Sequence, residues 1–264
     1  MKRQQRPIAL TIAGSDSGGG AGIQADLKTF TALGCHGTTA ITCITAQNPR
    51  AVIGIQPIRA DIVRKQIEAV FAELPPRVVK TGMLFSTEII NVVADYFAKG
   101  KRPPLVVDPV MVATSGAVLL KPSAIRALKE RLLPLATLVT PNLDEAQMLL
   151  GKKLRTLEDL LDAATELHAT FGCAALVKGG HLKLGADAVD VLFDGKRFTV
   201  LKAQRIKGVS THGTGCTYAA AIAAHLAGGE ELERAVALSK EFITRAIATS
   251  YFAGKHPSLN QQAC

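Results

Sequence analysis

The feature that most constrains the fold is a regular alternation of short apolar runs with longer amphipathic segments. The apolar runs have the length of buried strands and are rich in Ala, Val, Leu and Ile. They lie at residues 8–13, 39–45, 52–57, 78–80, 105–107, 137–140 and 174–178. Strands that alternate with helices along a chain form a mostly parallel sheet with helices on both faces. We therefore predict an α/β fold of this kind.

Helical patterns fill most of the segments between these runs. They lie at residues 21–33, 61–74, 87–98 and 122–133. The first pattern ends before Gly34, and glycine readily adopts the left-handed conformation of a helix C-terminus. The last begins at Pro122, and proline suits the first turn of a helix.

The last third of the chain has a different pattern. In the region 189–200, two apolar runs flank Asp194-Gly195, a dipeptide typical of a tight hairpin turn. From residue 215 to about 252, two alanine-rich helices are joined at Gly228-Gly229. No repeat or low-complexity linker interrupts the chain, so we predict that residues 1–264 form a single domain.

Composition favours a protein with a large buried core. Hydrophobic residues make up 48% of the chain and charged residues 20%, which argues against disorder. The 5 cysteines form no Cys-x-x-Cys pair, and their odd number favours a reducing cytosol. The basic N-terminus leads into an apolar run too short for a signal peptide, and no other stretch approaches a membrane span. We expect a cytoplasmic protein.

The formal net charge of +9 raises the question of a nucleic-acid partner. The lysines and arginines are dispersed along the chain, however, and no stacking aromatic residues lie among them. A solvated surface explains most of this charge, and attraction of an anionic nucleotide can explain the rest. We predict a small-molecule ligand, with no nucleic acid and no membrane as partner.

A glycine-rich segment joins the first predicted strand to the first helix. Residues 13–22 read A-G-S-D-S-G-G-G-A-G, a composition that lets backbone approach a ligand closely. The relaxed dinucleotide-binding pattern G-x-G-x-x-A fits residues 20–25. That pattern needs an acidic residue further along to bind the ribose, and the chain has no Asp or Glu between residues 27 and 60. The alternative is a plain tight turn. Asp26 follows on the helix and either points into the same crevice or is an ordinary solvated charge.

Polar groups follow two other strands at the edge of the sheet where ligands of open α/β folds bind. Gln47 offers a donor and an acceptor side by side, which match an aminopyrimidine edge; the alternative is an ordinary loop residue. Asn142 and Glu145 have the spacing of one helical face and can hold Mg²⁺ directly or through water. The alternative for this pair is a capping box, with Asn142 as N-cap and Glu145 reaching back.

The segment 208–216 opens the first alanine-rich helix and is rich in glycine. Backbone N–H groups at such a helix start form an anion hole, which suits phosphoryl transfer. Cys216 lies where the helix dipole lowers a thiol pKa, so it is a candidate general base or nucleophile. The alternative is a small hydrophobic core residue. Lys178 follows another strand and is a candidate ligand of ATP phosphates.

These segments resemble the hydroxymethylpyrimidine/phosphomethylpyrimidine kinases of bacterial thiamine biosynthesis, within the ribokinase-like superfamily. The similar motifs follow in the family's order and span essentially the whole chain. They are A-G-S-D-S-G-G-G-A-G-I-Q-A-D-L-K-T-F at 13–30, T-A-Q-N at 45–48, K-T-G-M at 80–83, V-D-P-V-M at 107–111, T-P-N-L-x-E at 140–145, V-K-G-G-H at 177–181 and H-G-T-G-C at 212–216.

The resemblance implies a ribokinase-like fold, two successive phosphoryl transfers from ATP with Mg²⁺, and a homodimer. The implied acceptors are 4-amino-5-hydroxymethyl-2-methylpyrimidine and then its monophosphate. Substrate-binding positions match Gly14, Asp26, Gln47, Met83 and Val110. Catalytic positions match Cys216 beside Gly213, Thr214 and Gly215, and the phosphate and metal positions match Lys178, Asp108, Asn142 and Glu145.

The nearest alternative is a pyridoxal kinase, because some relatives with the same cysteine-containing anion hole accept vitamin B6 alcohols. Pyridoxal lacks the 4-amino group, so Gln47 would lose its bidentate partner. A sugar or nucleoside kinase fits less well, since these enzymes normally carry aspartate in place of Cys216. A nucleotide-binding oxidoreductase would need a carboxylate that binds the ribose, and this chain lacks one after its glycine-rich turn. A non-catalytic binding module is the remaining alternative from another class.

The cysteine at position 216 generates a testable prediction. We infer that a carboxylate there would repel the incoming monophosphate, and that the second acceptor needs no deprotonation. Cys216→Asp is therefore expected to weaken monophosphate binding and to slow the second transfer more than the first. Steady-state kinetics with both acceptors measure this. Wild-type rates of both transfers with unchanged monophosphate affinity would contradict it.

Overall fold

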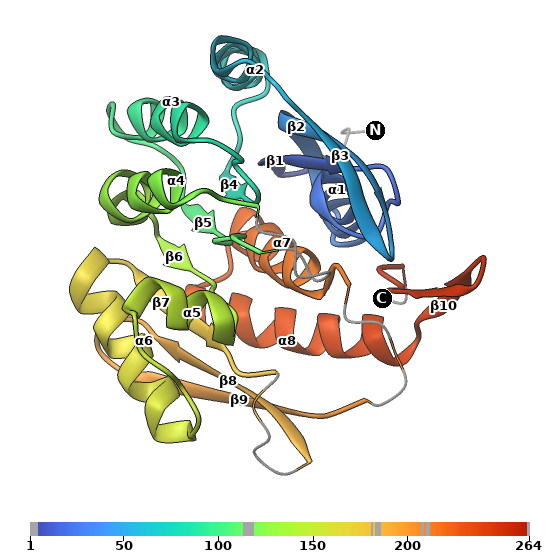
Figure 1. Ribbon diagram of the computed structural model, residues 1–264, viewed down its shortest axis with the longest axis vertical. Coiled ribbons are helices and arrows are strands. Elements are labelled where there is room, and N and C mark those ends of the chain that lie inside the picture. Colours follow the sequence, from blue (N-terminus) through green and yellow to red (C-terminus); the bar gives the residue numbers. More distant parts are fainter. Residues whose placement is uncertain are drawn as a thin grey trace.

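The computed structural model describes residues 5–112, 119–180, 182, 186–206, 209 and 212–262. Its strands are β1 (Ile8–Asp16), β2 (His36–Asn48), β3 (Ala51–Pro57), β4 (Val78–Thr81), β5 (Leu105–Val107), β6 (Leu138–Val139), β7 (Ala174–Lys178), β8 (Asp187–Phe193), β9 (Phe198–Gln204), β10 (Tyr251–Ala253) and β11 (His256–Ser258). The first nine form one sheet in the order β3-β2-β1-β4-β5-β6-β7-β8-β9 (Figure 1). Pairing is parallel from β2 through β1 and β4 to β7, and antiparallel where β3, β8 and β9 are added. The mostly parallel sheet predicted from the sequence is confirmed.

Helices cover both faces of this sheet (Figure 1). They are α1 (Gly22–Ala32), α2 (Ala60–Glu73), α3 (Thr87–Phe97), α4 (Pro122–Ala127), α5 (Leu143–Leu150), α6 (Leu157–Phe171), α7 (Thr214–Ala227) and α8 (Leu232–Ala248). Helices α2 to α6 share one hydrophobic cluster with the sheet, whereas α1, α7 and α8 share the other. The central strands are therefore buried on both faces, which explains their uninterrupted apolar sequence.

Strand β1 illustrates this double burial. Leu10 and Ile12 are fully buried in the cluster on the α2–α6 face. Ala9, on the opposite side of the same strand, is fully buried in the cluster that contains Phe30 of α1 and Ile222 of α7. Because side chains alternate along a strand, one short apolar run anchors both helical layers.

The C-terminal elements follow the sequence prediction closely. The predicted hairpin is formed by β8 and β9, with Gly195 in the left-handed region at φ +93°. Helices α7 and α8 are the two predicted alanine-rich helices, and Gly229 between them has φ +96°. Both expectations are confirmed, although the hairpin extends beyond its predicted ends.

Three local features differ from the prediction. The helix expected at 122–133 changes after α4 into a π turn at Leu128–Leu132 and a 3₁₀ turn at Leu133–Leu135, because Pro134 has no N–H to continue the helix. The pattern analysis missed α6, although Thr156 and Asp159 form a capping box at its start. It also missed the small β10–β11 hairpin, whose strands have three residues each.

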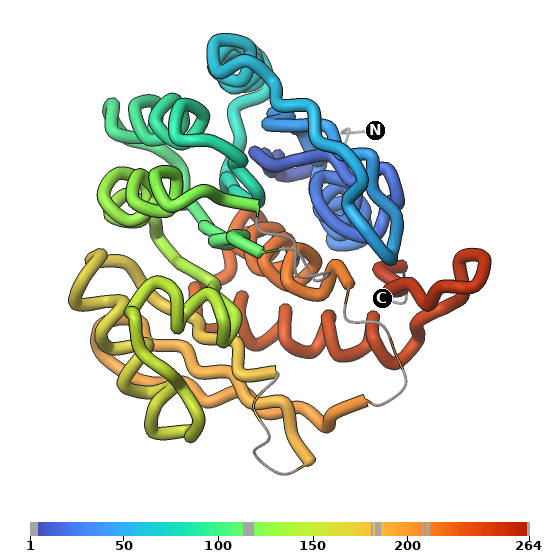
Figure 2. Tube along the Cα trace, in the orientation of Figure 1, coloured from blue at the N-terminus to red at the C-terminus, as the bar shows by residue number. Residues whose placement is uncertain are grey.

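Helices α1 and α7 are far apart in the chain but lie side by side in the fold (Figure 2). Helix α1 follows the glycine-rich turn after β1, and α7 begins at the predicted anion hole. Strand β1 is parallel to its neighbours, so its carboxyl end shares an edge with those of β2, β4 and β5. The fold therefore brings both glycine-rich segments to that edge, the usual place for a ligand.

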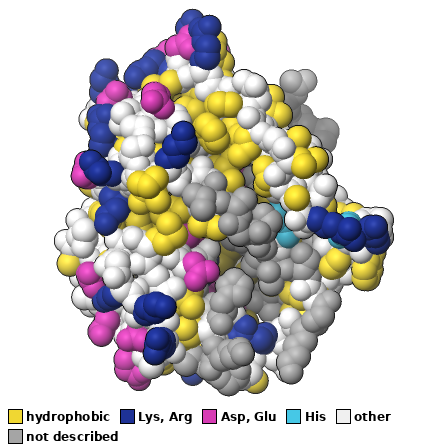
Figure 3. All heavy atoms as spheres, viewed as in Figure 1, with side chains coloured by type: hydrophobic (Ala, Val, Ile, Leu, Met, Phe, Trp, Pro, Cys, Tyr) yellow, Lys and Arg dark blue, Asp and Glu magenta, His cyan; other side chains and the backbone are white. Residues whose placement is uncertain are grey.

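The surface agrees with the dispersed charge of the sequence. On the face shown in Figure 3, Lys and Arg side chains are scattered mostly around the periphery and form no single stripe. In the part of the chain that the structure describes, no helix has the length and hydrophobicity to cross a membrane.

Gly22 at the start of α1 gives a stability prediction with a matched control at Gly172. Both residues have positive φ, +56° and +76°, but a methyl group on Gly22 would overlap the carbonyl oxygen of Gly14, whereas one on Gly172 would meet nothing within 4 Å. Gly172→Ala should lower the free energy of unfolding by about 1 kcal/mol through backbone strain. Gly22→Ala should cost about 3 kcal/mol or more, because backbone must also move. Urea denaturation measures both, and equal losses would contradict the argument.

Candidate active site

A cavity of about 800 Å³ opens at the carboxyl edge of the sheet. Gly14 lines it from β1, Gln47 from β2, and Met83 from the loop after β4. Residues 213–216 line it from the start of α7. The structure therefore brings the predicted anion hole and the predicted substrate-binding residues into one cavity, although they are separated by most of the chain.

Two further groups predicted from the sequence also line this cavity. Val110 follows β5 and is one of the lining residues. Asp108, Asn142, Glu145 and Lys178 form a polar group at the ends of β5, β6 and β7. Residues 208, 210 and 211 of the glycine-rich segment 208–216, and His181 of the motif at 177–181, lie outside the described residues. The small-residue segment 113–117 (A-T-S-G-A) lies outside them too.

Asp26 lies beneath the cavity and not on its wall. Its carboxylate accepts hydrogen bonds from Lys80 Nζ at 2.8 and 3.0 Å and from Thr11 Oγ1 at 2.6 Å. The side chains of Asp26 and Lys80 are 0% exposed. Burial raises the pKa of the Asp26 carboxyl, and the Lys80 ammonium opposes that rise. The direct substrate contact implied for Asp26 is thus not supported, because its oxygens are occupied by buried partners; Lys80 lines the cavity instead.

The Cys216 thiol lies in the first turn of α7. Burial raises the pKa of Cys216 to about 11, although the nearby Lys80 ammonium acts to lower it. Asp26 and Asp108 add to the rise. The pKa is therefore raised and not lowered as the position at the helix start predicts, because desolvation of the thiolate is the largest effect. At neutral pH the thiol carries its proton.

Lys178 and Asp108 form a charged pair beside the start of α7. Lys178 Nζ donates to Asp108 Oδ1 at 3.0 Å, and Thr140 Oγ1 donates to the same oxygen at 3.1 Å. A methyl group on Gly215 would lie 3.4 Å from Lys178 Nζ. Burial lowers the pKa of Lys178, but Asp108 and Glu145 outweigh this effect and the pKa is raised. A permanent cation therefore lies beside the backbone of α7.

Asn142 and Glu145 form the capping box that was the structural alternative in the sequence. Asn142 Oδ1 accepts from the Glu145 N–H at 2.9 Å, and the Asn142 N–H donates to Glu145 Oε2 at 2.8 Å. Burial raises the pKa of Glu145 to about 8, against the lowering effect of Lys178. Because both residues also line the cavity, the capping role and a ligand-binding role are compatible.

The donor set limits how a metal ion can be held. Within the described residues, no cluster of three or more His, Cys, Asp or Glu side chains is suited to a metal ion. Mg²⁺ commonly uses one or two carboxylates together with waters and substrate phosphates. Glu145 and Asp108, two buried carboxylates near Lys178, fit that mode of binding and not a cage built by the protein alone.

The sequence did not predict the part of the cavity formed by the β8–β9 hairpin and α8. Apolar side chains from the β8–β9 hairpin and from α8 line it, namely Ala188, Ala203, Ile206, Ile243 and Ile247. Lys240 of α8 donates to Asp190 of β8 at 2.7 Å, and both charges are buried beside it. The hairpin and α8 carry no motif typical of a ligand site, so only their packing reveals this region.

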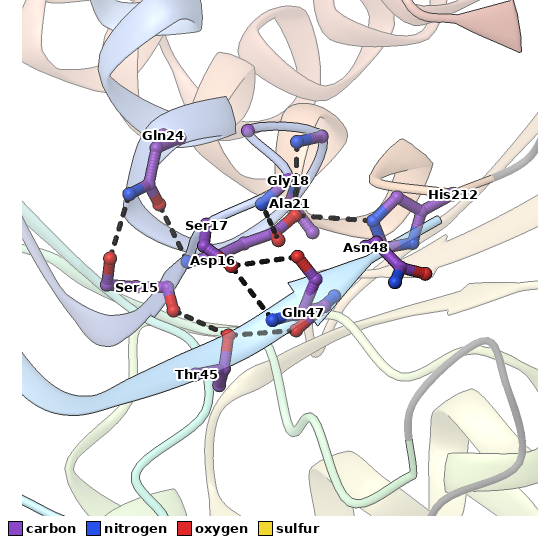
Figure 4. Close-up of polar contacts among 12 residues, drawn as sticks. Ser15, Asp16, Ser17, Gly18, Ala21, Gln24, Thr45, Gln47, Asn48 and His212 are labelled. Carbon is purple, nitrogen blue, oxygen red and sulfur yellow. Dashed lines mark hydrogen bonds and ion pairs between the residues drawn. The ribbon is translucent and has the colours of Figure 1, made fainter. Parts of the chain in front are cut away.

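Asp16 and His212 were also missed as partners (Figure 4). His212 Nε2 lies 3.3 Å from Asp16 Oδ2, although 196 positions separate the two residues. In the sequence, His212 stood out only as part of the motif H-G-T-G-C at 212–216. Asp16 precedes three consecutive small residues before Gly20, a composition that does signal a side-chain-stabilised turn.

The comparisons with known proteins agree with this architecture. The mostly parallel sheet, its two helical layers and the cavity at its carboxyl edge define a ribokinase-like small-molecule kinase. The chain belongs to the phosphomethylpyrimidine kinase family, which matches residues 16–260.

Individual relatives cover nearly all of this chain. It is 52% identical over 245 residues to the hydroxymethylpyrimidine/phosphomethylpyrimidine kinase of Rhizobium meliloti, covering 92% of this chain and 91% of that one. It is 52% identical over 242 residues to the thiamine biosynthesis bifunctional protein ThiED of Geobacter sulfurreducens, covering 92% of this chain but only 49% of the relative's length. Among solved structures, an ADP complex of Bacillus subtilis pyridoxal kinase has a TM-score of 0.90 and 40% identity, covering 98% of both chains.

The raised pKa of Glu145 predicts a pH-dependent effect on stability. Between the ordinary carboxyl pKa of 4.5 and about 8, the folded state binds the proton more tightly than the unfolded state. The free energy of unfolding of the wild type therefore falls as pH rises through this window, by up to about 1.4 kcal/mol per pH unit for this group. Glu145→Gln removes the titrating carboxyl. The free energy of unfolding of this variant should therefore rise relative to that of the wild type as the pH increases.

Urea denaturation at about pH 5 and about pH 8 measures the difference. Glu88→Gln is the control, because the Ser86 hydroxyl holds the pKa of Glu88 below its ordinary value. That control should show no such improvement. A constant difference between Glu145→Gln and wild type would contradict the prediction.

Proposed function

We propose that this protein transfers a phosphoryl group from ATP to the hydroxyl of 4-amino-5-hydroxymethyl-2-methylpyrimidine, and then a second one to the resulting monophosphate. The observation that carries the proposal is that residues 213–216 line the same cavity as Gly14 and Gln47. An anion hole thereby faces an amide that can read an aminopyrimidine. The family match and the names of the relatives support the same reaction.

The acceptor binds at the β1–β2–β4 end of the cavity in this proposal. Glycine at position 14 lets Cys43 and Met83 pack closely against the backbone of β1, because a methyl group there would lie 2.8 Å from Cys43 Sγ and 2.9 Å from Met83 Cε. Gln47 pairs with the ring nitrogen and the amino group, and Met83 and Val110 pack against the flat ring. Asp26 contributes indirectly by holding the Lys80 ammonium at the cavity floor.

Phosphoryl transfer depends on positioning and on neutralisation of spreading negative charge. The N–H groups of Gly213, Thr214 and Gly215 provide donors at the positive end of the α7 dipole. Lys178 adds a cation beside them. The base in the first transfer is the Cys216 thiolate, which takes the acceptor proton. Because burial keeps the thiol protonated at neutral pH, it must first lose its own proton, and the Lys80 charge favours that loss. The second acceptor, the monophosphate, is already an anion and needs no base to remove a proton.

ATP occupies the other half of the cavity in this proposal. Lys178 and Asp108 lie at its phosphates, and Asn142 and Glu145 hold Mg²⁺ through water. The ion supplies neutralisation of phosphate charge when it is bound. The apolar end formed by the β8–β9 hairpin and α8 suits the adenine ring. The homodimer and the cytoplasmic location implied above stay predictions.

A second candidate function is pyridoxal phosphorylation. The likeness to the Bacillus subtilis pyridoxal kinase favours it, because that structure covers 98% of this chain with 40% identity. Both acceptors are flat heteroaromatic alcohols, so the same cavity can accommodate either. The 4-amino group is the chemical difference that Gln47 can detect.

Release of ADP is the direct test of the proposed function. The purified protein, with ATP and Mg²⁺, should release ADP when the pyrimidine alcohol is added, and a second equivalent should follow as the monophosphate is converted. No turnover with either acceptor would contradict the proposal and favour a non-catalytic binding module. Turnover with pyridoxal alone would favour the second candidate.

Gln47→Ala should separate the two substrates. Loss of a bidentate contact of about 1–3 kcal/mol should lower kcat/KM for the pyrimidine alcohol about 10- to 100-fold. The value for pyridoxal should change much less, because that contact is not made. Gln56→Ala on the exposed edge strand β3 is the matched control. An equal effect of Gln47→Ala on both substrates would argue against the pyrimidine-reading role.

A further inference from the structure

The contact between Asp16 and His212 joins two loops with different tasks (Figure 4). Asp16 ends β1 and begins the glycine-rich turn on the acceptor side. His212 directly precedes Gly213, the residue that caps the N-terminus of α7. The 3.3 Å separation between His212 Nε2 and Asp16 Oδ2 therefore bridges the acceptor-binding turn and the anion hole.

The Asp16 carboxylate also organises the turn itself. Oδ1 accepts from the Gly18 N–H at 2.8 Å, and Oδ2 accepts from the N–H groups of Gly20 at 3.0 Å and Ala21 at 2.8 Å. The residue is only 3% exposed. Burial acts to raise the pKa of Asp16, but His212 and these backbone donors outweigh it and the pKa is lowered. One buried negative charge thus holds the turn and faces the imidazole.

Close packing of backbone reinforces this junction. A methyl group on Gly20 would lie 2.8 Å from His212 Cδ2. Gly213 has φ +80°, and a methyl group on it would overlap the carbonyl oxygen of Gly20. The backbones of Gly20 and Gly213 are therefore in direct contact, so a small shift of one loop displaces the other.

The turn is also connected to the acceptor-reading residue. Ser17 Oγ donates to the carbonyl oxygen of Gln47 at 2.8 Å and accepts from the Gln47 N–H at 2.8 Å. Thr45 Oγ1 donates to the carbonyl oxygen of Ser15 at 2.8 Å. A continuous set of contacts therefore runs from Gln47 through the glycine-rich turn and Asp16 to His212.

We propose that His212 is a positioning residue that, through Asp16, fixes the backbone amides of Gly213 to Cys216 relative to the acceptor-binding turn. This inference rests on the proposed phosphoryl transfer. Its physical basis is that donors of an anion hole act only when they are held at the oxygens where charge develops. A displacement of about 1 Å can cost about 100-fold in rate.

Substitutions at His212 test the role. Gln places an N–H donor near the position of His Nε2, whereas Asn is too short to reach it. His212→Ala and His212→Asn should lower kcat about 10- to 100-fold, with KM for either acceptor within about threefold of wild type. His212→Gln should retain kcat within about threefold. His36→Ala, at an exposed histidine remote from the cavity, is the control and should leave both constants unchanged.

A double-mutant cycle tests whether His212 acts through Asp16. Asp16→Asn should itself lower kcat, because it replaces an acceptor of the turn with a donor. Adding His212→Ala to that variant should then change kcat by less than about threefold. The same 10- to 100-fold loss in both backgrounds would overturn the proposal, and so would a loss confined to the monophosphate acceptor, which would indicate direct contact with its phosphate.

Hydrogen–deuterium exchange separates this inference from the proposed reaction. In His212→Ala, amides of residues 16–22 and 212–217 should exchange faster together, whereas His212→Gln should match wild type. Absence of turnover in the wild type would contradict the proposed function. The exchange rates of the His212 variants would still decide whether His212 holds the two loops together. Unchanged exchange at both segments in His212→Ala would overturn the positioning role.

Discussion

The cavity depends on a buried ion pair below its floor. Asp26 of α1 and Lys80 of β4 are 0% exposed, and Thr11 of β1 supplies a third hydrogen bond to the carboxylate. Burying two charges is costly unless their geometry and hydrogen bonds are good, and here Asp26 accepts three hydrogen bonds from Lys80 and Thr11. The pair ties together three elements that each contribute to the cavity. It also holds an ammonium close enough to Cys216 to favour the thiolate.

Charge compensation recurs around the cavity. Lys178 is paired with Asp108, and Lys240 with Asp190, so each cation lies beside a buried carboxylate from another element of the fold. These pairs fix the cations in position before a ligand arrives, which is how preorganised sites gain their effect on a transition state. The backbone N–H groups at the start of α7 complete the arrangement, because they add positive potential without adding a side chain that occupies space.

The site shows where local patterns were informative and where they were misleading. Asn142 and Glu145 form the capping box that their spacing indicates, yet they also line the cavity, so the two interpretations were not exclusive. Cys216 occupies the expected helix start, but burial raises its pKa. Asp26 lies on the expected helix, but its side chain points into protein and not into the cavity. For Cys216 and Asp26 the sequence placed the residue on the correct element, but burial and charged partners brought together by folding set its surroundings.

By itself, the sequence determined the mostly parallel α/β sheet, because apolar periodicity is a local property of the chain, and its motifs carried the resemblance to the family. It also indicated that residues 213–216 should meet Gly14 and Gln47, since ligands bind at one edge of such a sheet. Only the tertiary structure decided that Lys80 faces the cavity above Asp26, 54 positions away, and that His212 meets Asp16 across 196 positions. The burial of a side chain, the shift of its pKa and its hydrogen-bond partners depend on groups that folding brings together from distant parts of the chain. A local sequence pattern therefore cannot predict them.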